Sequence, residues 1–394
     1  MKNEVVIVAA ARTAIGKFGG SLNDISAVEL GRTVTRSLLD KTGLDASQVN
    51  QTIFGMVLQA GNGQNPARQI ALGAGIPVTS PAMTVNEVCG SGMKSIQLAC
   101  QAILLGDADV VVAGGSESMS QAPHLSYQRW GNKAGNITLI DSLFHDGLTD
   151  AFSGQAMGVT AENVANAYHI NRQEQDEFAN SSQTKATKAQ EAGYFEDEIV
   201  PVEIPGKRGQ ASTFFASDEG IRSNTNLESL AKLRTVFQTD GSVTAGNSST
   251  INDGAAAVLL MSREKAEELG LKVLARITGY SEVAIEPDIM GVAPVKAIQT
   301  LLTKTQQDQS DIDLWEINEA FASQSLAVIK DLHLDPATVN ITGGAIALGH
   351  PIGASGTRIL VTLVHQLHRL GKKQGVASLC VGGGMGLAVG IEVD

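Results

Sequence analysis

The chain has 394 residues, of which 43% are hydrophobic and 18% charged, and its formal net charge is −12. This composition is typical of a globular protein with two or three domains and excludes a disordered or fibrous chain. The negative charge argues against nucleic acid or an anionic membrane as the main partner, because both need a basic face.

The cysteines and the N-terminal residues indicate where the protein resides. Three widely spaced cysteines, at positions 89, 100 and 380, do not form a disulfide framework and predict a reducing compartment. The apolar run over residues 5–11 is too short for a signal peptide, and no stretch approaches the ~20 apolar residues of a membrane span. We therefore expect a cytoplasmic protein.

The first third of the chain alternates apolar runs with amphipathic ones. A continuous apolar run predicts a buried strand over 5–10, and the pattern over 28–41, stopped by Gly43, predicts a helix. After these we expect a strand at 52–57, a polar loop at 59–66, a short helix at 67–74, a strand leading to Cys89, a helix at 93–105 and a strand at 109–113 ending in Gly114-Gly115. This order is that of an α/β fold.

Cys89 is the first residue that suggests chemistry. It lies at or just before the helix at 93–105, where free N–H groups and the helix dipole favour a thiolate, so it is a candidate nucleophile. The alternative is a buried cysteine that packs like a small hydrophobic residue. For Cys100, on the apolar face of the same helix, that alternative is our prediction.

The segment over 119–249 is rich in Asn, Gln, Ser and Thr and has few apolar runs. We interpret it as a lid or ligand-binding insert in the first half of the fold. Within it, Asn171 and Glu174 are spaced as a capping box that opens a helix running to Gly193. The apolar pattern resumes as a predicted strand over 255–261.

Two passages of the chain have the same pattern. Residues 90–92, a helix, Gly106 and an apolar run ending in paired glycines resemble residues 353–356, a helix, Gly371 and a similar run. We interpret this as a duplicated α/β unit whose two copies face a shared site. The predicted domains are residues 1–118 with 250–271, the insert 119–249, and the second half 272–394.

Three further motifs lie near the C-terminus. Asn318 follows a predicted strand over 313–317, His350 lies among the glycines of 343–353, and Cys380 opens a glycine-rich run over 380–386. Together with Cys89 and the 61–68 motif, these residues resemble the thiolase family, and specifically its acetyl-CoA acetyltransferases, over nearly the whole chain. The resemblance implies two duplicated α/β halves packed as a layered α-β-α-β-α core, with an inserted loop domain.

The resemblance also implies catalytic roles for a Claisen condensation of two acetyl-CoA molecules and its thiolytic reverse. Cys89 would be acylated, His350 would take its proton, and Cys380 would move the proton alpha to the thioester carbonyl. One oxyanion hole would combine His350 with a water held by Asn318, and the other the backbone N–H groups of Cys89 and Gly382.

Coenzyme A would bind in the insert. By resemblance, Arg222 would lie beside the adenine, Ser229 near the nucleotide and Ser249 at the pantetheine amide. The apolar tunnel would be lined by Leu148, Met157, Phe237, Ala245, Ala320 and Phe321. Acetyl-CoA, acetoacetyl-CoA and CoA would be the only small molecules needed, with no cofactor and no metal, and the family suggests a homotetramer built from dimers.

One position departs from the family pattern. Biosynthetic thiolases carry a histidine just before the pair Met157-Gly158, where this chain has Ala156. The variant over 155–157 is similar to the thiolase portion of bifunctional thiolase/HMG-CoA reductase proteins of Gram-positive bacteria. That similarity suggests a role in mevalonate synthesis.

Several alternatives remain open. A degradative 3-ketoacyl-CoA thiolase would share the four catalytic side chains, and a 3-ketoacyl-carrier-protein synthase would share the fold but use histidine where this chain has Cys380 or Asn318. The run over 344–349 lacks the lysine of a phosphate loop. His365 and His368 have no acidic or cysteine companions and are expected on the surface. A redox or metal protein would need cysteines at closer spacing.

Overall fold

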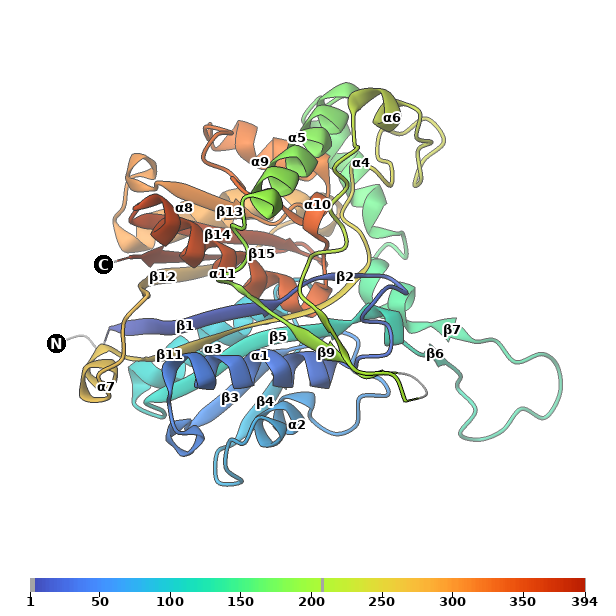
Figure 1. The fold of residues 1–394 in the computed structure, drawn as a ribbon. Helices are drawn as coiled ribbons and strands as arrows, with labels where there is room; N and C mark the ends of the chain where they lie inside the picture. Colours follow the sequence, from blue (N-terminus) through green and yellow to red (C-terminus); the bar gives the residue numbers. More distant parts are fainter. Residues whose placement is uncertain (1–3, 207–208, 394) are drawn as a thin grey trace.

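The computed structural model describes residues 4–206 and 209–393. Residues 1–3, 207–208 and 394, which the predicted domains include, lie outside this described part. Two α/β halves lie one above the other, the first third of the chain below and the last third above (Figure 1). Both described chain ends lie at the same side, away from the long loops that the middle of the chain contributes.

In the described part of the chain, eleven strands form one continuous sheet that spans both halves. Its main order is β4-β3-β5-β11-β1-β12-β15-β14-β13, with β2 and β8 added at β11 and β1. The halves join where β1 pairs with β12, through Val6 with Arg276 and Ile7 with Ala275. The bounds are β1 (Val5–Thr13), β2 (Gly16–Lys17), β3 (Gln51–Gly55), β4 (Ala82–Val85), β5 (Val110–Ser118), β8 (Ile199–Val200), β11 (Asn252–Ser262), β12 (Ala275–Ala284), β13 (Leu314–Ile317), β14 (Gln374–Val381) and β15 (Met385–Glu392).

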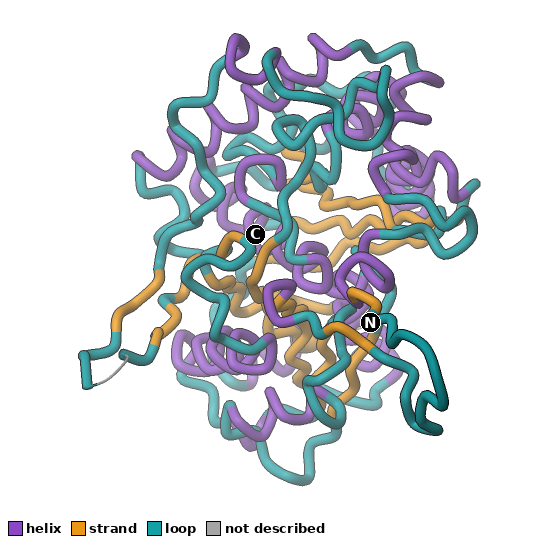
Figure 2. Tube along the Cα trace, turned by 90° about the vertical axis from the view of Figure 1, so that its right-hand side faces the viewer, coloured by secondary structure: helices purple, strands orange, loops and turns teal. Residues whose placement is uncertain are grey.

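Helices form three layers around the two halves of this sheet. The outer helices of the first half are α1 (Ala27–Thr42) and α2 (Pro66–Gly73), and those of the second are α8 (Ala293–Thr305) and α9 (Ala322–Asp331). Between the halves lie α3 (Ser91–Leu105) and α11 (Ile352–Leu370), which pack on each other and on strands of both (Figures 1 and 2). This layering confirms the predicted fold.

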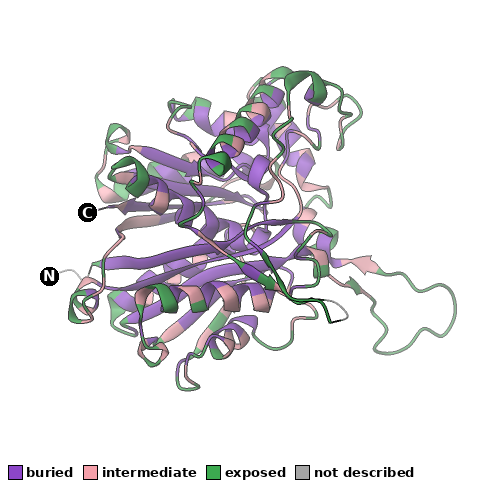
Figure 3. Ribbon diagram, viewed as in Figure 1, coloured by how far each residue is buried: buried purple, intermediate pink, exposed green. Residues whose placement is uncertain are grey.

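The core that holds the halves together surrounds the two central helices. Ile96 and Ile103 of α3 pack with Ile359 and Leu363 of α11 and with the inner faces of both sheet halves. The central strands β1, β5, β11, β14 and β15 are buried almost throughout, whereas β12 is mostly half-buried and the outer helices expose one face (Figure 3). Because α3 is a core helix, the segment Val88–Leu105, the one described stretch long and apolar enough to cross a membrane, reads as part of this core. Cys100 is buried there, as predicted.

Local signals placed the helix ends well. Ser26 caps α1 by accepting from the N–H of Glu29, and Gly43 ends the helix in the left-handed conformation, as a glycine can. The Asn171–Glu174 capping box is present and opens α5 (Arg172–Glu191). The stop at Gly43 and the capping box were predicted and are confirmed, because each depends on hydrogen bonds within four residues. The cap at Ser26 was not predicted.

The strand predicted to end in Gly114-Gly115 is longer than expected. β5 continues to Ser118, paired with β11 as far as Asp253. The glycines do not mark a turn; a Cβ on Gly115 would lie 2.0 Å from the carbonyl oxygen of Gly353. Gly115 allows α11 to approach the sheet closely, whereas Gly114 faces β11 and Phe54.

The middle of the chain leaves after β5 and returns as β11, which pairs beside it. It contributes α4 (Met157–Ala167), α5, α6 (Leu227–Ala231) and two hairpins, β6 (His124–Leu125) with β7 (Ile140–Asp141) and β9 (Val202–Ile204) with β10 (Thr213–Phe215). Two further helices are α7 (Arg263–Glu268) and α10 (Ala345–Leu348). The division into three domains stays a prediction.

The two histidines of α11 differ in exposure. His368 is exposed, as expected, and its Nε2 lies 2.7 Å from the carbonyl oxygen of Leu274. The prediction was wrong for His365, which is half-buried with Nε2 3.1 Å from the carbonyl oxygen of Ala10. The central position of α11, invisible in the sequence, leaves little of this helix at the surface.

Candidate active site

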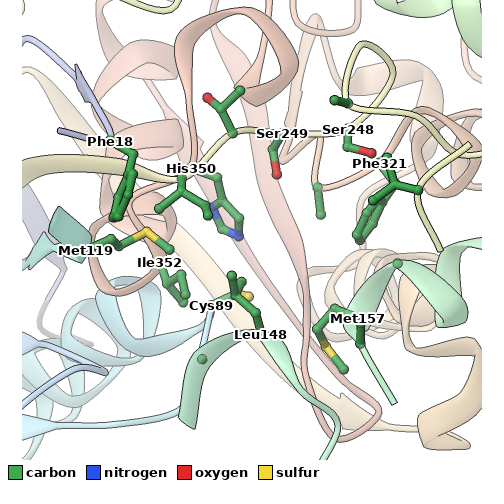
Figure 4. Close-up of a pocket in the computed structure, with 18 of the residues that line it drawn as sticks. Phe18, Cys89, Met119, Leu148, Met157, Ser248, Ser249, Phe321, His350 and Ile352 are labelled. Carbon is green, nitrogen blue, oxygen red and sulfur yellow. The ribbon is translucent and has the colours of Figure 1, made fainter. Parts of the chain in front are cut away.

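A cavity of about 680 Å³ opens where loops of both halves and of the middle segment meet. Cys89 and His350 both line it (Figure 4). Cys89 follows β4, Asn318 follows β13 and Cys380 lies at the end of β14, so the chemistry-bearing residues lie beyond the carboxyl ends of strands. This arrangement agrees with the expectation of a shared site between two similar halves.

The segment before α3 holds Cys89 in a tight, strained turn. Val88 has φ of 45°, which is unfavourable for a β-branched residue. Ser91 fixes the turn, because its Oγ accepts from the N–H of Glu87 at 2.9 Å and donates to the carbonyl of Val88 at 2.6 Å. The strain is consistent with a side chain that must project into a site.

The protonation state of Cys89 differs from the prediction. Burial raises the pKa of the Cys89 thiol to about 11, although hydrogen bonds from the backbone N–H groups of Gly382 and of Cys89 itself favour the thiolate. The nearby carboxylate of Glu117 raises this pKa further. The expected thiolate was therefore wrong, because loss of solvation outweighs the helix start, and the resting nucleophile is a thiol.

This assignment predicts a late titration of Cys89. Thiolate absorbance in the ultraviolet, taken as the difference between the wild type and Cys89→Ala, should be absent near neutral pH and should rise toward a midpoint of about 11. The physical reason is that half-buried Cys89 lies among apolar side chains, so a thiolate there is poorly solvated. A midpoint on the acidic side of an ordinary thiol, about 8.5, would contradict it.

The backbone of His350 is held by an asparagine that sequence reasoning missed. Asn252, at the start of β11, accepts from the N–H of His350 at 2.9 Å and donates to the carbonyl of Gly16 at 3.0 Å. Gly349 precedes the histidine with φ of 110°, and a Cβ there would lie 2.4 Å from Cγ of Asn252. Only glycine allows this approach.

Ser355 determines which ring nitrogen of His350 can act as the base. Its Oγ donates to the carbonyl of Pro351 at 2.9 Å and lies 2.5 Å from Nδ1 of His350. Since the single hydroxyl proton goes to Pro351, the oxygen must accept a proton donated by Nδ1. The proton on Nδ1 leaves Nε2 with the lone pair that a general base needs.

His350 is also kept neutral. Burial, with the positive charge of Arg358 as the second cause, lowers the pKa of His350 to about 4. Near neutral pH the site therefore holds an uncharged thiol and an uncharged imidazole. A proton moves between them only when an electrophile arrives, which suits acyl transfer.

Cys380 lies behind the cavity wall. It is fully buried in an apolar cluster with Phe321 and Met290, and Met157 packs against that cluster. Burial, and then the neighbouring Cys89, raise the pKa of Cys380 well above its usual range. Cys380 is consequently a thiol that can donate a proton, and the structure brings it beside Cys89 as the motifs predicted.

Asn318 is fully buried, and its backbone N–H donates to the carbonyl of Ser378 at 3.0 Å. Within residues 4–206 and 209–393, neither Oδ1 nor Nδ2 of its side chain has a hydrogen-bond partner. Buried amides are nearly always satisfied, so this side chain is suited to bind a water or a ligand atom.

Gly382 follows β14 and donates its N–H to the Cys89 sulfur. A Cβ at this position would make ordinary contacts, 3.4 Å from Cγ1 of Val88 and 3.5 Å from Sδ of Met157. The surrounding chain therefore does not demand glycine, and any requirement must come from a bound acyl group.

Most residues expected to contact coenzyme A line the cavity, namely Leu148, Met157, Arg222, Phe237, Ala245, Ser249, Ala320 and Phe321. Ser229 does not. It lies exposed at the start of α6, where it belongs to the capping box of Asn226. Ala156 also lines the cavity, immediately before α4.

Other lining residues escaped the sequence analysis. Phe18, Met119, Met290 and Ile352 contribute apolar surface from four different segments. No local pattern distinguishes them from core residues, and only Phe18, a large apolar side chain in a glycine-rich loop, offered a signal. In the described residues, no group of three or more His, Cys, Asp or Glu is placed to hold a metal ion.

Comparisons with known proteins agree with this geometry. The family described as "Thiolase, N-terminal domain" matches residues 5–264 and "Thiolase, C-terminal domain" matches residues 271–393. The chain is 57% identical to an acetyl-CoA acetyltransferase of Chromobacterium violaceum, over 99% of each chain.

Two solved structures are also similar. The Bacillus anthracis acetyl-CoA acetyltransferase superposes with a TM-score of 0.97 at 46% identity, covering 100% of this chain and 99% of that one. Human mitochondrial 3-ketoacyl-CoA thiolase in complex with CoA has a TM-score of 0.95 at 44% identity, covering 100% and 98%.

Proposed function

The chain belongs to the thiolase family, and from this premise we propose that it is an acetyl-CoA C-acetyltransferase. It would condense two acetyl-CoA molecules to acetoacetyl-CoA and CoA, and run the thiolytic reverse, through an acetyl group on Cys89. The observation that carries the proposal is the pairing of a Cys89 thiol with an unprotonated Nε2 of His350 in one apolar cavity.

The protonation states fit the first half of thiolysis. As Sγ of Cys89 attacks the 3-keto carbon of acetoacetyl-CoA, Nε2 of His350 takes the thiol proton. The bond between C2 and C3 breaks, and the electron pair leaves as the enolate of acetyl-CoA. Cys380, a thiol because of its burial, protonates C2 and becomes a thiolate beside the new imidazolium.

The second half restores the enzyme. The CoA thiol gives its proton to the Cys380 thiolate and attacks the acetyl group on Cys89. The Cys89 sulfur leaves and takes the proton from His350, so that both thiols and the neutral imidazole are regenerated. Condensation is the same sequence in reverse, and no external oxidant, reductant or cofactor is required.

Two donor sets would stabilise the developing oxyanions. The N–H groups of Cys89 and Gly382, which already point at the Cys89 sulfur, suit the oxygen of the acyl-cysteine. The buried side-chain amide of Asn318, which has no hydrogen-bond partner among the described residues, is suited to hold a water. That water and His350 would together donate to the thioester oxygen. Each such donor is typically worth about 3 to 4 kcal/mol in the transition state.

The cavity suits a pantetheine thioester. Apolar side chains from both halves and the middle segment surround it, with the hydroxyls of Ser248 and Ser249 on one side, and Arg222 is an exposed cation at its lining (Figure 4). An acidic protein can bind anionic CoA in this way because a local cation suffices for phosphates that remain largely in solvent.

A degradative 3-ketoacyl-CoA thiolase is the second candidate. The similarity to the human 3-ketoacyl-CoA thiolase favours it, and Ala156 presents only a methyl group to the cavity, at the place where biosynthetic thiolases carry histidine. The two candidates share their chemistry and differ in the length of the acyl group that fits beside Met157 and Met290.

The deciding experiment is thiolysis of acetoacetyl-CoA and of 3-ketohexanoyl-CoA by free CoA, followed by loss of the enolate absorbance. Activity on acetoacetyl-CoA alone supports the acetyltransferase, and faster turnover of 3-ketohexanoyl-CoA supports the degradative enzyme. Absence of both activities would contradict the proposed function and return attention to a ketosynthase that uses a carrier protein.

The remaining features of the proposal rest on the sequence. A cytoplasmic homotetramer without cofactor is what the family resemblance and the cysteine usage suggest. The role in mevalonate synthesis depends only on the variant over 155–157.

A further inference from the structure

Glu117 is a buried carboxylate near the site that the mechanism above does not use. It lies on β5 with no exposed surface. Its Oε2 accepts from the N–H of Val57 at 3.0 Å and from the N–H of Gly353 at 2.9 Å, and its Oε1 accepts from the N–H of Leu58 at 3.1 Å. In the part of the chain that the structure describes, none of its hydrogen-bond partners is a lysine or an arginine.

These hydrogen bonds connect segments that are far apart in the chain. Val57 and Leu58 belong to the loop after β3 in the first half, whereas Gly353 is in the first turn of α11 in the second half. That turn begins two residues after His350. Pro351, which caps α11, offers no side-chain acceptor, so Glu117 serves a helix N–H that would otherwise be unsatisfied.

The contact is closely fitted. A Cβ on Gly353 would lie 2.6 Å from Oε2 of Glu117 and 3.0 Å from Cα of Met56. The start of α11 is thus enclosed between the carboxylate and the loop, and a shift of either moves the other. Packing this tight transmits displacement rather than absorbing it.

The same linkage reaches the nucleophile. Val57, Leu58 and Ile352 form one apolar cluster, and Cys89 packs against it. Both Cys89 and Ile352 line the cavity. Glu117 therefore holds, from opposite sides, the backbone beside His350 and the apolar wall beside Cys89.

A carboxylate is the side chain that this position requires. Three N–H groups converge on it, and only a carboxylate presents acceptors on both oxygens. Glutamine would have nearly the same shape, but its NH₂ group would face an N–H donor.

The negative charge of Glu117 makes the thiolate form of Cys89 less favourable. A nearby negative charge raises the pKa of Cys89, and burial raises the pKa of Glu117 itself to about 7, with Asp253 on β11 as a further cause. A carboxylate that opposes the Cys89 thiolate is hard to explain as an activating charge, so a geometric role is the better explanation.

We propose that Glu117 is a positioning residue that holds His350 in place relative to Cys89 by tying the loop after β3 to the start of α11. The turnover test of this proposal rests on the proposed function. A second test, the rate of Cys89 alkylation, needs no substrate.

The turnover test compares Glu117→Gln and Glu117→Asp with the wild type in acetoacetyl-CoA thiolysis. Both variants should lower kcat by about tenfold or more with KM little changed, because misplaced catalytic groups slow chemistry more than binding. Aspartate keeps the negative charge but moves the carboxylate away from the N–H of Gly353, so it separates the effect of position from that of charge. It also provides the test if the glutamine variant fails to fold. Wild-type kcat in Glu117→Asp would overturn the proposal.

Asp313→Asn is the matched control. Asp313 also accepts from two backbone N–H groups, those of Lys373 and Gln374, at 3.0 and 2.9 Å, but at the end of β13 away from Asn318. Its kcat should equal that of the wild type. An equal loss of kcat in Asp313→Asn would overturn the proposal, since it would mean that removing any carboxylate that binds backbone N–H groups slows turnover.

The substrate-free test is a double-mutant cycle on the rate of Cys89 alkylation by iodoacetamide. If Glu117 acts through His350, Glu117→Gln should slow alkylation about tenfold when His350 is present. The same substitution should not slow alkylation in a His350→Ala background. Effects of charge alone occur in both backgrounds and cancel. If the effects of the two substitutions on the alkylation rate are additive, the inference is overturned; if they are coupled, it is supported. Both outcomes hold whether or not acetoacetyl-CoA proves to be a substrate.

Discussion

Replacing Cys89 with alanine is expected to lower the rate of acetoacetyl-CoA thiolysis by on the order of 10⁴-fold or more. The reason is that neither of the other cysteines can carry the acetyl group in its place: Cys100 is buried in the core around α3, and Cys380, whose pKa burial raises well above its usual range, keeps its proton until the enolate forms. His350 and the oxyanion donors would remain but could act only on water or CoA directly. The loss should appear in kcat, with CoA binding retained, because Cys89 contributes little to the large cavity surface.

Cys100→Ala is the matched control for this experiment. It removes one sulfur from the central core and should leave kcat unchanged while lowering the melting temperature, since it creates a small cavity. Incubation with acetyl-CoA followed by mass spectrometry should find an acetyl group on the peptide with Cys89 in this control and in the wild type. If Cys89→Ala retained substantial turnover, or if the acetyl group were found elsewhere, the covalent mechanism would be wrong.

Replacing Cys380 with serine is expected to separate the two halves of the reaction. Thiolysis and condensation should both fall by about 10²- to 10⁴-fold, the usual contribution of a general acid or base. The physical reason is that an alcohol is a far weaker acid than a thiol and cannot protonate the enolate carbon as readily. Acetylation of Cys89 by acetyl-CoA should continue, because that exchange breaks no carbon–carbon bond and never turns Cys380 into a thiolate. Starting from the resting thiol of Cys380, His350 takes the Cys89 proton and passes it to the leaving CoA sulfur.

The measurement is therefore a pair of assays on one variant: enolate absorbance for turnover, and exchange of labelled CoA into acetyl-CoA for the acyl transfer step. Serine places a hydroxyl in the cluster with Phe321 and Met290, which costs about 1–3 kcal/mol when unpaired, so the melting curve must be recorded as well. Equal losses in both assays in a folded variant would show that Cys380 serves the thiol chemistry at Cys89 instead of the proton at C2.

Both expectations depend on Cys89 and Cys380 being thiols at rest, which is not what the helix start near Cys89 predicts. A helix start predicted a Cys89 thiolate, but the residue lies under the loops of both halves, where a charge loses its solvation. The same burial keeps Cys380 protonated and His350 neutral. The helix dipole is a local term worth up to about 2 kcal/mol, whereas full burial can shift a pKa by up to about five units, so burial decides.

The resemblance found in the sequence identified the side chains that meet at the cavity but not what supports them. Ser355 sets the tautomer of His350, Asn252 holds its backbone, and Glu117 ties its helix to the opposite half. Each of these residues is an ordinary polar side chain in its own segment. Ser355 lies only five residues from His350, whereas the partners of Asn252 and Glu117 are brought to them by the packing of the second half on the first.

The sequence by itself determined the elements and the candidate chemistry of this protein. Gly43 and the Asn171–Glu174 box marked helix ends, apolar runs marked the buried strands, and the cysteine, histidine and asparagine motifs marked the site, because periodicity and capping depend on contacts within a few residues. Only the tertiary structure decided the length of β5, the protonation of Cys89 and the role of Glu117. The length of β5 follows from its pairing with β11. The other two follow from the packing of the two halves, which brings Gly382 to Cys89 and Gly353 to Glu117 from more than two hundred residues away.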